Sequence, residues 1–289
     1  MSKVDHQYRI NEILNTIHRD ISADLSAKKL AEMAAYSEQY FHRIFKKVTG
    51  ESVHQYIRRA RLETAANQLI FSPNQTVSRI AETCGFSSIP SFTRTFKEVY
   101  SVTPGEWRSG KKYDKKHYFL SNPEIHAAYR RLEYAELPKP KIVNLPPMSV
   151  AYVRHKGYSR SISEAWETLT AWAMSQNRST KIQIGLHHSN PALVPLEDCR
   201  YVACIGIEKP ITRRGKVNSA IIPGGLHAQF KIDGKFGELL PYISKILEQW
   251  LPNSGYVART TPAFAVYSKN QYLSKDDKFQ LQFHLPISV

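Results

Sequence analysis

The sequence predicts two domains, an all-α N-terminal half and an α+β C-terminal half. Up to residue 110 apolar side chains recur at a period of 3.6, as in the set Ile10, Ile13, Leu14 and Ile17. From Pro146 onward alternating stretches are separated by two helical ones. Between them lies a charged segment that ends in 137–141, whose prolines disfavour helix. We therefore expect domains at 1–111 and 141–289, joined by a linker at 112–140.

The N-terminal half contains an internal repeat. Leu30-Ala31-Glu32 aligns with Ile80-Ala81-Glu82, and one inserted residue brings Phe41-x-Arg43-x-Phe45-Lys46 onto Phe92-x-Arg94-x-Phe96-Lys97. Each copy reads as an apolar helix, a short turn and a second helix with a basic face, which is the layout of a helix-turn-helix. A helix that opens with the capping box Ser52-x-x-Gln55 joins the copies. About 20 helical residues span about 30 Å, close to the 34 Å between successive major grooves, so one chain could read two adjacent half-sites.

The first candidate recognition helix begins after Ser37 and turns a polar stripe outward. On this stripe Arg43 can bind guanine, and Gln39 or His42 can reach base edges. In the second helix the candidates for base contacts are Ser91, Thr93 and Arg94, but its first turn carries Ile89 and Pro90. We therefore expect the first helix to read sequence more stringently than the second. Candidate phosphate contacts are Lys28, Lys46, Lys47, Arg58, Arg59, Arg61 and Lys97.

The motif Ile80-Ala81-x-x-Cys84-Gly85-Phe86, followed by Phe92-x-Arg94-x-Phe96-Lys97 and Thr103-Pro104, resembles the signature of the AraC/XylS family of bacterial transcription regulators. The resemblance covers about 20–109. It implies a tandem, homeodomain-like reader of double-stranded promoter DNA, often an activator that contacts RNA polymerase. A reader at the N-terminus with a different C-terminal domain is similar to the Rob type within that family.

The C-terminal half repeats as well. Residues 145–157 align with 222–234 at a constant offset of 77, and each copy reads as strand, helix, strand and strand. The first helix is expected to begin at the capping box Ser161-x-x-Glu164, and the second to run from Phe236 to Trp250. Two such units related by a pseudo-twofold axis leave a groove along their seam, where small molecules bind.

The order of Ala151-Tyr152-Val153-Arg154, Gly185, Cys199-Arg200-Tyr201 and Pro262-x-Phe264-x-Val266-Tyr267 resembles the GyrI-like effector-binding domain. The resemblance implies multidrug or other small-ligand sensing. Members commonly carry a buried glutamate just before the Val-Tyr pair, where its carboxylate neutralises cationic drugs. Here that position is Ala265, which favours a neutral or anionic effector over a cationic one. Candidate pocket residues are Tyr152, Trp166, Phe264, Ala265 and Tyr267.

The formal charge of +15 divides evenly, with +7 in 1–117 and +8 in 118–289, and it predicts an anionic partner. Apolar stretches are too short to span a membrane, and three cysteines fit a reducing cytoplasm. No metal or other cofactor is expected, since His187 and His188 would point to opposite faces of a strand.

We conclude from the sequence that the chain is a cytoplasmic transcription regulator and not an enzyme. Two alternatives stay open for the C-terminal half. Some GyrI-like proteins are hydrolases that depend on active-site carboxylates, and the Ala265 substitution argues against that activity. The half could instead be an interaction module, for instance one that binds gyrase.

Overall fold

The computed structural model describes residues 3–110, 122–191, 193–209, 211 and 216–289. The chain divides into two compact units. One contains helices α1 to α7, and the other contains α8 to α10 and the sheet. We describe each by itself. The predicted fold class, an all-α part followed by an α+β part, is confirmed.

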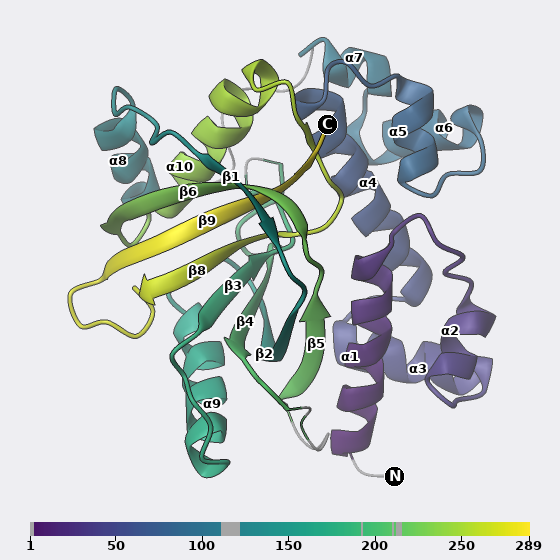
Figure 1. The fold of residues 1–289 in the computed structure, drawn as a ribbon. Helices are drawn as coiled ribbons and strands as arrows, with labels where there is room; N and C mark the ends of the chain where they lie inside the picture. Colours follow the sequence, from purple (N-terminus) through teal and green to yellow (C-terminus); the bar gives the residue numbers. More distant parts are fainter. Residues whose placement is uncertain (1–2, 111–121, 192, 210, 212–215) are drawn as a thin grey trace. The chain divides into compact units, whose positions relative to one another are not determined.

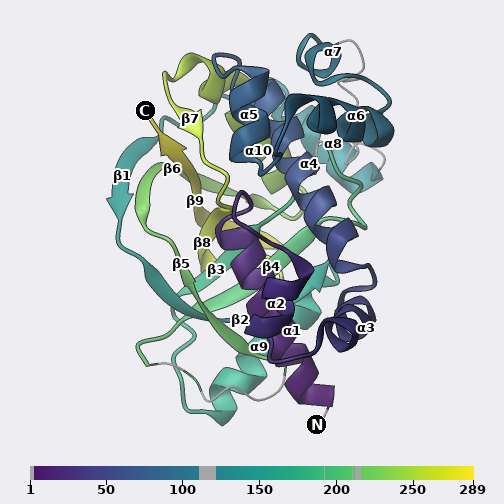
Figure 2. The same cartoon turned by 90° about the vertical axis from the view of Figure 1, so that its right-hand side faces the viewer.

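The first unit consists of two helix-turn-helix motifs joined by one long helix (Figure 2). Its helices are α1 (Lys3–Arg19), α2 (Ala27–Met33), α3 (Glu38–Thr49), α4 (Val53–Phe71), α5 (Val77–Thr83), α6 (Ile89–Tyr100) and α7 (Pro104–Arg108). The predicted apolar face of α1 is buried against Phe41 and Phe45 of α3 and Tyr56 of α4. In the second motif Phe92 and Phe96 are fully buried, and the Trp107 indole Nε1 donates to the Ala66 carbonyl at 3.2 Å.

Local signals in the sequence place the helix ends. The capping box of Ser52 and Gln55 forms at the start of α4, and that of Thr103 and Glu106 forms at the start of α7. Ser37 caps α3, where its hydroxyl accepts from the Tyr40 amide. At the other end of α3, Gly50 takes a left-handed φ of 84°.

The two turns share one backbone conformation. Ala35 in the first turn and Gly85 in the second are left-handed, with φ of 52° and 80°. The next amide in each motif, Tyr36 or Phe86, donates to a carbonyl five residues back at 3.0 Å. This 6→1 hydrogen bond ends the first helix and aims the recognition helix.

The second unit contains a curved antiparallel sheet with helices α9 and α10 (Figure 1). Its elements are α8 (Pro123–Leu132), β1 (Lys141–Leu145), β2 (Met148–Lys156), α9 (Ile162–Ser175), β3 (Gln183–His187), β4 (Arg200–Gly206), β5 (Asn218–Ile222), β6 (Gly225–Lys235), α10 (Leu239–Lys245), β7 (Val257–Ala258), β8 (Ala263–Lys269) and β9 (Lys278–Ser288). The strand order is β1-β6-β9-β8-β3-β4-β2-β5, and β7 pairs with β9. Reading this order from either end exchanges the two repeats, so the pair β3 and β8 lies on a pseudo-twofold axis.

Each repeat has one strand more than the sequence predicted. The extra strands, β1 and β5, lie at opposite edges of the sheet, and β1 pairs with β6 of the other repeat. The side chains of β1 are exposed or half-buried, so the strand lacks the alternation that identifies a strand in sequence.

Two predicted helix features are wrong. Ser161 does not cap α9, because its hydroxyl bonds to Ser159 and His155 instead. The second helix does not run from Phe236 to Trp250: α10 covers Leu239–Lys245, and residues Ile246–Trp250 continue it as a π-helix. Apolar residues spaced at i, i+3 and i, i+4 do not distinguish an α-helix from a π-helix.

The segment expected to be a linker contains α8. Ile125 and Ala128, three residues apart on this helix, are 2% and 0% exposed. The residues from 111 to 121 lie outside the described residues. The boundaries 1–111, 112–140 and 141–289 stay a prediction.

Candidate DNA interface and effector cavity

Helix α3 presents the predicted polar stripe to solvent. Gln39 and Arg43 are exposed, and the Arg43 guanidinium lies 4.8 Å from the centre of the Tyr40 ring. His42 is half-buried, with its Nε2 3.9 Å from a Glu38 carboxylate oxygen and its ring 5.4 Å from that of His54. Gln39 and Arg43 are therefore accessible to a base edge, whereas His42 has protein partners of its own.

Helix α6 presents a different surface. Arg94 is exposed, and Ser91 and Thr93 are half-buried. The first turn, which enters the groove in a recognition helix, carries the exposed Pro90 and Ile89, whose exposure is 44%. The first turn of α6 therefore presents methyl groups and backbone to DNA, and the nearest side chain that can donate two hydrogen bonds is that of Arg94.

The candidate phosphate contacts fall into three groups. Lys28, Lys46, Lys47 and Lys97 are exposed and form no ion pair with any residue that the structure describes. Arg58 is paired with Glu98 at 2.5 Å, but both side chains are about half exposed. Such an exposed pair is worth at most about 1 kcal/mol, so a phosphate can replace the carboxylate.

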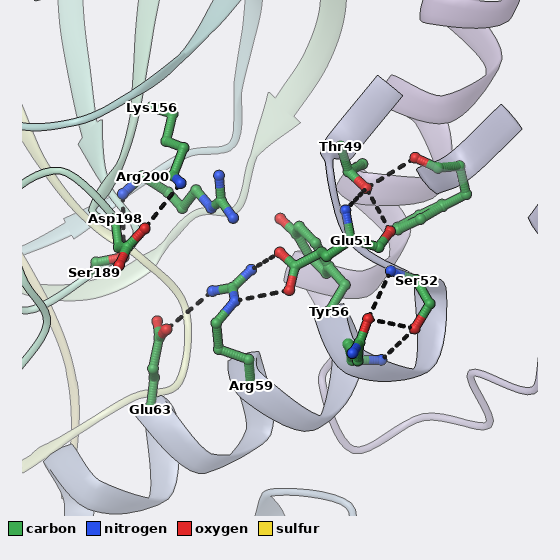
Figure 3. Close-up of polar contacts among 12 residues, drawn as sticks. Thr49, Glu51, Ser52, Tyr56, Arg59, Glu63, Lys156, Ser189, Asp198 and Arg200 are labelled. Atoms are coloured by element: carbon green, nitrogen blue, oxygen red, sulfur yellow. Dashed lines mark hydrogen bonds and ion pairs between the residues drawn. The ribbon is translucent and has the colours of Figure 1, made fainter. Parts of the chain in front are cut away.

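Arg59 is held by carboxylates of the protein itself (Figure 3). Its guanidinium donates to both Glu51 oxygens, at 3.3 and 2.8 Å, and to Glu63 at 2.9 Å, and it stacks on Tyr56. Burial alone would lower the pKa of Arg59, but the carboxylates of Glu63 and Glu51 raise it above its usual value. This side chain joins the start of α4 to its second turn and is not free for DNA.

Arg61 connects the two motifs. Its Nε donates to the Ile21 carbonyl and its NH2 group to the Ala23 carbonyl, both at 3.1 Å, so it holds the loop between α1 and α2. The same guanidinium fills the space beside Gly85, where a Cβ atom would lie 2.7 Å from it. Burial lowers the pKa of Arg61. Its contacts are structural.

In the C-terminal unit, Trp166 and Tyr267 lie on the side of the sheet that the helices cover. The Trp166 indole donates to the Tyr201 hydroxyl at 3.2 Å, and that hydroxyl lies 3.4 Å from the Tyr267 hydroxyl. Tyr201 crosses Gly185, where a Cβ would come within 2.8 Å of the ring carbon Cζ. Gly185 is thus required for the ring to lie over the pseudo-twofold axis.

The five predicted pocket residues are divided between the two faces of the sheet, and their assignment to an effector pocket stays a prediction. Neighbours on a strand point to opposite sides, so Phe264 faces away from Ala265 and Tyr267. Phe264 joins Tyr152 in the apolar cluster on the other face, where its ring stacks on His284 at 4.7 Å. Ala265, paired with Gly185 and Phe283, is fully buried on the helix side.

A cavity of about 20 Å³ lies beside this tyrosine cluster, with room for about one water molecule. It is lined by Ile125, Tyr158, Ile162, His187, Tyr201, Phe236, Gly237, Leu239, Leu240, Gln271 and Tyr272. None of these side chains is a carboxylate, lysine or arginine. Both ring nitrogens of His187 are buried without a hydrogen-bond partner among the described residues, and burial lowers its pKa to about 4. The cavity therefore offers a neutral imidazole among aromatic rings.

Comparison with known proteins agrees with this geometry. Residues 138–288 match the family model described as GyrI-like small molecule binding domain, and residues 30–110 match a helix-turn-helix domain model. The chain belongs to the GyrI-like family. Together with an AraC-type helix-turn-helix half, this makes it a DNA-binding transcription regulator with a small-molecule-binding domain.

The curated relatives align with the N-terminal half. The multiple antibiotic resistance protein MarA of Salmonella typhimurium is 36% identical over 120 residues, which are 42% of this chain and 92% of MarA. The Tn10 TetD protein of Escherichia coli is 38% identical over 38% of this chain and 78% of its own length. The regulator YbfP of Bacillus subtilis is 34% identical over 36% of this chain and 35% of its own.

Solved structures resemble the GyrI-like half. The C-terminal domain of EcmrR matches with a TM-score of 0.42 and 12% identity, over 53% of this chain and 99% of that one. A hydrolase from Listeria innocua matches with a TM-score of 0.38 and 14% identity, over 55% and 96%. Neither likeness is strong enough to bear on the activity of this chain. Among the described residues no helix combines the length and the apolarity needed to cross a bilayer.

Sequence reasoning missed part of the GyrI-like cavity. It did not select His187 or Tyr272 as lining residues, and it placed Ile125 in a linker. Strand alternation provides one usable signal, because His187 and Tyr201 pair across β3 and β4 and so share a face. The contribution of Ile125 depends on where α8 packs, which no local pattern shows.

Proposed function

We propose that the chain is a cytoplasmic transcription activator that binds a promoter operator through α3 and α6 and contacts RNA polymerase. The observation that carries the proposal is the pair of exposed arginines, Arg43 and Arg94, at equivalent positions of two matching motifs. Each can form the bidentate contact that specifies guanine.

The two helices contribute unequally. Gln39 and Arg43 of α3 read bases, and His42 joins them when its ring turns from Glu38. Ser91, Thr93 and Arg94 of α6 add a weaker preference because Ile89 and Pro90 occupy its first turn. The phosphate contacts are Lys28, Lys46, Lys47, Lys97 and Arg58. Arg59 and Arg61, whose guanidinium groups are engaged inside the protein, are left out of this set.

The C-terminal half binds an uncharged effector in the cavity beside His187. A charged ligand would be buried there without a counter-charge, which costs several kcal/mol. This agrees with Ala265 standing where the family commonly carries a glutamate. We propose no enzymatic activity for this half, because the lining residues supply neither a carboxylate nor a thiol that could act on a substrate.

Selection of genomic DNA fragments by the purified full-length protein, at one salt concentration near physiological ionic strength, tests the regulator. We expect an asymmetric motif that spans about two major-groove turns. The matched control is the double variant R43A/R94A, which keeps every phosphate contact and should retain DNA with a motif that is relaxed at the two positions read by these arginines. Retained fragments with no shared motif for the unmodified protein would reject sequence-specific regulation, leaving only charge-driven binding.

A further inference from the structure

The cavity beside His187 is closed on one side by α8. Ile125 lines the cavity, and a Cβ atom built on Gly237, another lining residue, would lie 3.7 Å from both the Ile125 Cα and the Ala128 Cβ. A molecule larger than water that enters here must displace this helix or the elements opposite it.

Helix α8 is held weakly by apolar contacts. Of its ten residues only Ile125 and Ala128 are buried, whereas the 14-residue α9 buries five, Trp166 and Leu169 among them. Elements with few buried apolar contacts are the ones that open locally in native proteins. The cavity is thus covered by a helix that buries little apolar surface.

Polar contacts hold both ends of α8. At its N-terminal end Glu124 accepts from Arg160 at 2.7 Å, and Arg160 also pairs with Asp277 and lies 4.2 Å from the centre of the Phe236 ring. At its C-terminal end Arg131 pairs with Glu238 at 3.0 Å. The pair at the N-terminal end is about half exposed on both sides, so it contributes little and is screened by salt. In the pair at the C-terminal end Arg131 is exposed, but the Glu238 side chain is only 13% exposed.

The C-terminal end has one further contact. The ammonium of Lys245, at the last residue of α10, donates to the carbonyls of Leu132, Glu133 and Ala135. It satisfies backbone acceptors that a helix end leaves open. This contact joins the end of α8 to the place where α10 changes into a π-helix, so the C-terminal end of α8 can act as a pivot while its N-terminal end moves.

We propose that α8 is a lid, hinged at Lys245, that opens to admit the effector to the His187 cavity. This rests on the proposed small-molecule function of that cavity. Helix α8 follows residues 111–121, through which the chain passes from the helix-turn-helix half, so opening the lid moves the point where the chain enters the GyrI-like half. An effector that binds the open state more tightly would thereby shift its population.

A thiol placed inside the cavity measures lid opening without knowledge of the effector. Ile162 lines the cavity and is 1% exposed, so the I162C thiol should react with the small neutral reagent N-ethylmaleimide only when the lid opens. Adding E124Q and R131A removes the ion pair at each end of α8, and we call this combination the latch variant. Its labelling rate should be about three- to tenfold higher. R130A is the matched control, since Arg130 is an exposed arginine of the same helix with no ion pair among the described residues.

Native Cys204, fully buried on the other face of the sheet, reports on global unfolding in the same sample. Equal labelling rates in the latch variant and R130A would overturn the lid. So would a parallel rise at Cys204, which would mean that the whole unit loosens. Fragment selection with the latch variant keeps the two proposals apart: a retained DNA motif with unchanged labelling rejects only the lid.

Hydrogen exchange in the unmodified chain gives a second test, which does not depend on whether I162C folds. Amides of α8 should exchange together and at least about tenfold faster than those of α9. Exchange of α8 and α9 at the same rate would contradict the proposal.

Discussion

The two helix-turn-helix motifs have the same backbone but different side chains at the turn and on the recognition helix. Both turns use a left-handed residue and the same 6→1 hydrogen bond, yet the first uses Ala35 and the second Gly85. Only at Gly85 does a neighbour, Arg61, occupy the space of a Cβ atom. The difference teaches that the two motifs keep one backbone geometry, while the side chains at their turns and on their outward faces differ.

The largest effect should come from the recognition helices. R43A should weaken binding to the preferred operator by about 1–3 kcal/mol and relax the base preference at one position, because a bidentate contact is lost. R94A should cost less, since α6 presents Ile89 and Pro90 in its first turn. Titrations on matched and mismatched operators at fixed salt measure both. Equal loss on every sequence would reassign Arg43 to a phosphate, and a larger loss for R94A would reverse the order of the motifs.

The second motif should tolerate no Cβ atom at its turn. G85A should lower the free energy of unfolding of the first unit by about 1–2 kcal/mol, because an L-residue is strained at φ of 80° and the new methyl group displaces Arg61 from its carbonyl partners. Site-resolved hydrogen exchange of α5 and α6 in the full chain measures the change. Unaltered protection in α5 would show that Arg61 moves aside freely.

Cys84 occupies the position that Ala34 occupies in the first motif. The effect of its thiol on stability should appear only at alkaline pH. Burial raises the pKa of the Cys84 thiol from 9.0 to about 12. As pH rises from 9 to 12 the unfolded chain loses this proton before the folded chain does, so the stability that the neutral thiol provides falls. C84A should therefore leave the free energy of unfolding of the first unit nearly unchanged at pH 7. At pH 10 the variant should avoid a loss of about 1 kcal/mol that the unmodified protein suffers. The measurement is the urea midpoint of each protein at the two pH values, followed through hydrogen exchange in α5. A difference between C84A and the unmodified protein that does not change with pH would contradict a buried neutral thiol.

The smallest effect should be a gain. A35G relieves the strain of an alanine at φ of 52° and adds some entropy to the unfolded chain, so we expect a net stabilisation of about 0.5 kcal/mol. Exchange of α2 and α3 amides provides the measurement. A destabilised variant would mean that the Ala35 methyl group makes a contact worth more than its strain.

The sequence predicted what depends on local pattern. It gave both motifs, their caps at Ser52 and Thr103 and the buried stripe of α1, because period and capping chemistry act over a few residues. It could not separate Arg58 from Arg59 and Arg61, which look alike in the chain. Their partners, Glu51 and the Ile21 carbonyl among them, become neighbours only through tertiary packing.

The lining of the cavity depends on one signal that the sequence carries and on one that it does not. Phe264 and Ala265 are adjacent on a strand, so the alternation rule alone excludes them from one pocket lining. The role of Ile125 was not accessible in the same way. Its burial with Ala128 marks only a narrow apolar stripe, and the prolines that follow α8 pointed to a linker.

Helix α4 has a consequence for the shape of the operator. Its 19 residues form one rod of about 28 Å without glycine or proline, somewhat shorter than the 34 Å repeat of B-DNA. A helix of fixed length cannot stretch to fit the DNA, so we expect the duplex to curve and bring successive grooves within reach of α3 and α6. The elastic cost of that curvature depends on base steps that no side chain touches. Promoters with easily kinked base steps between the half-sites should therefore be favoured. Part of the sequence preference would then come from the deformability of the DNA and not from base contacts.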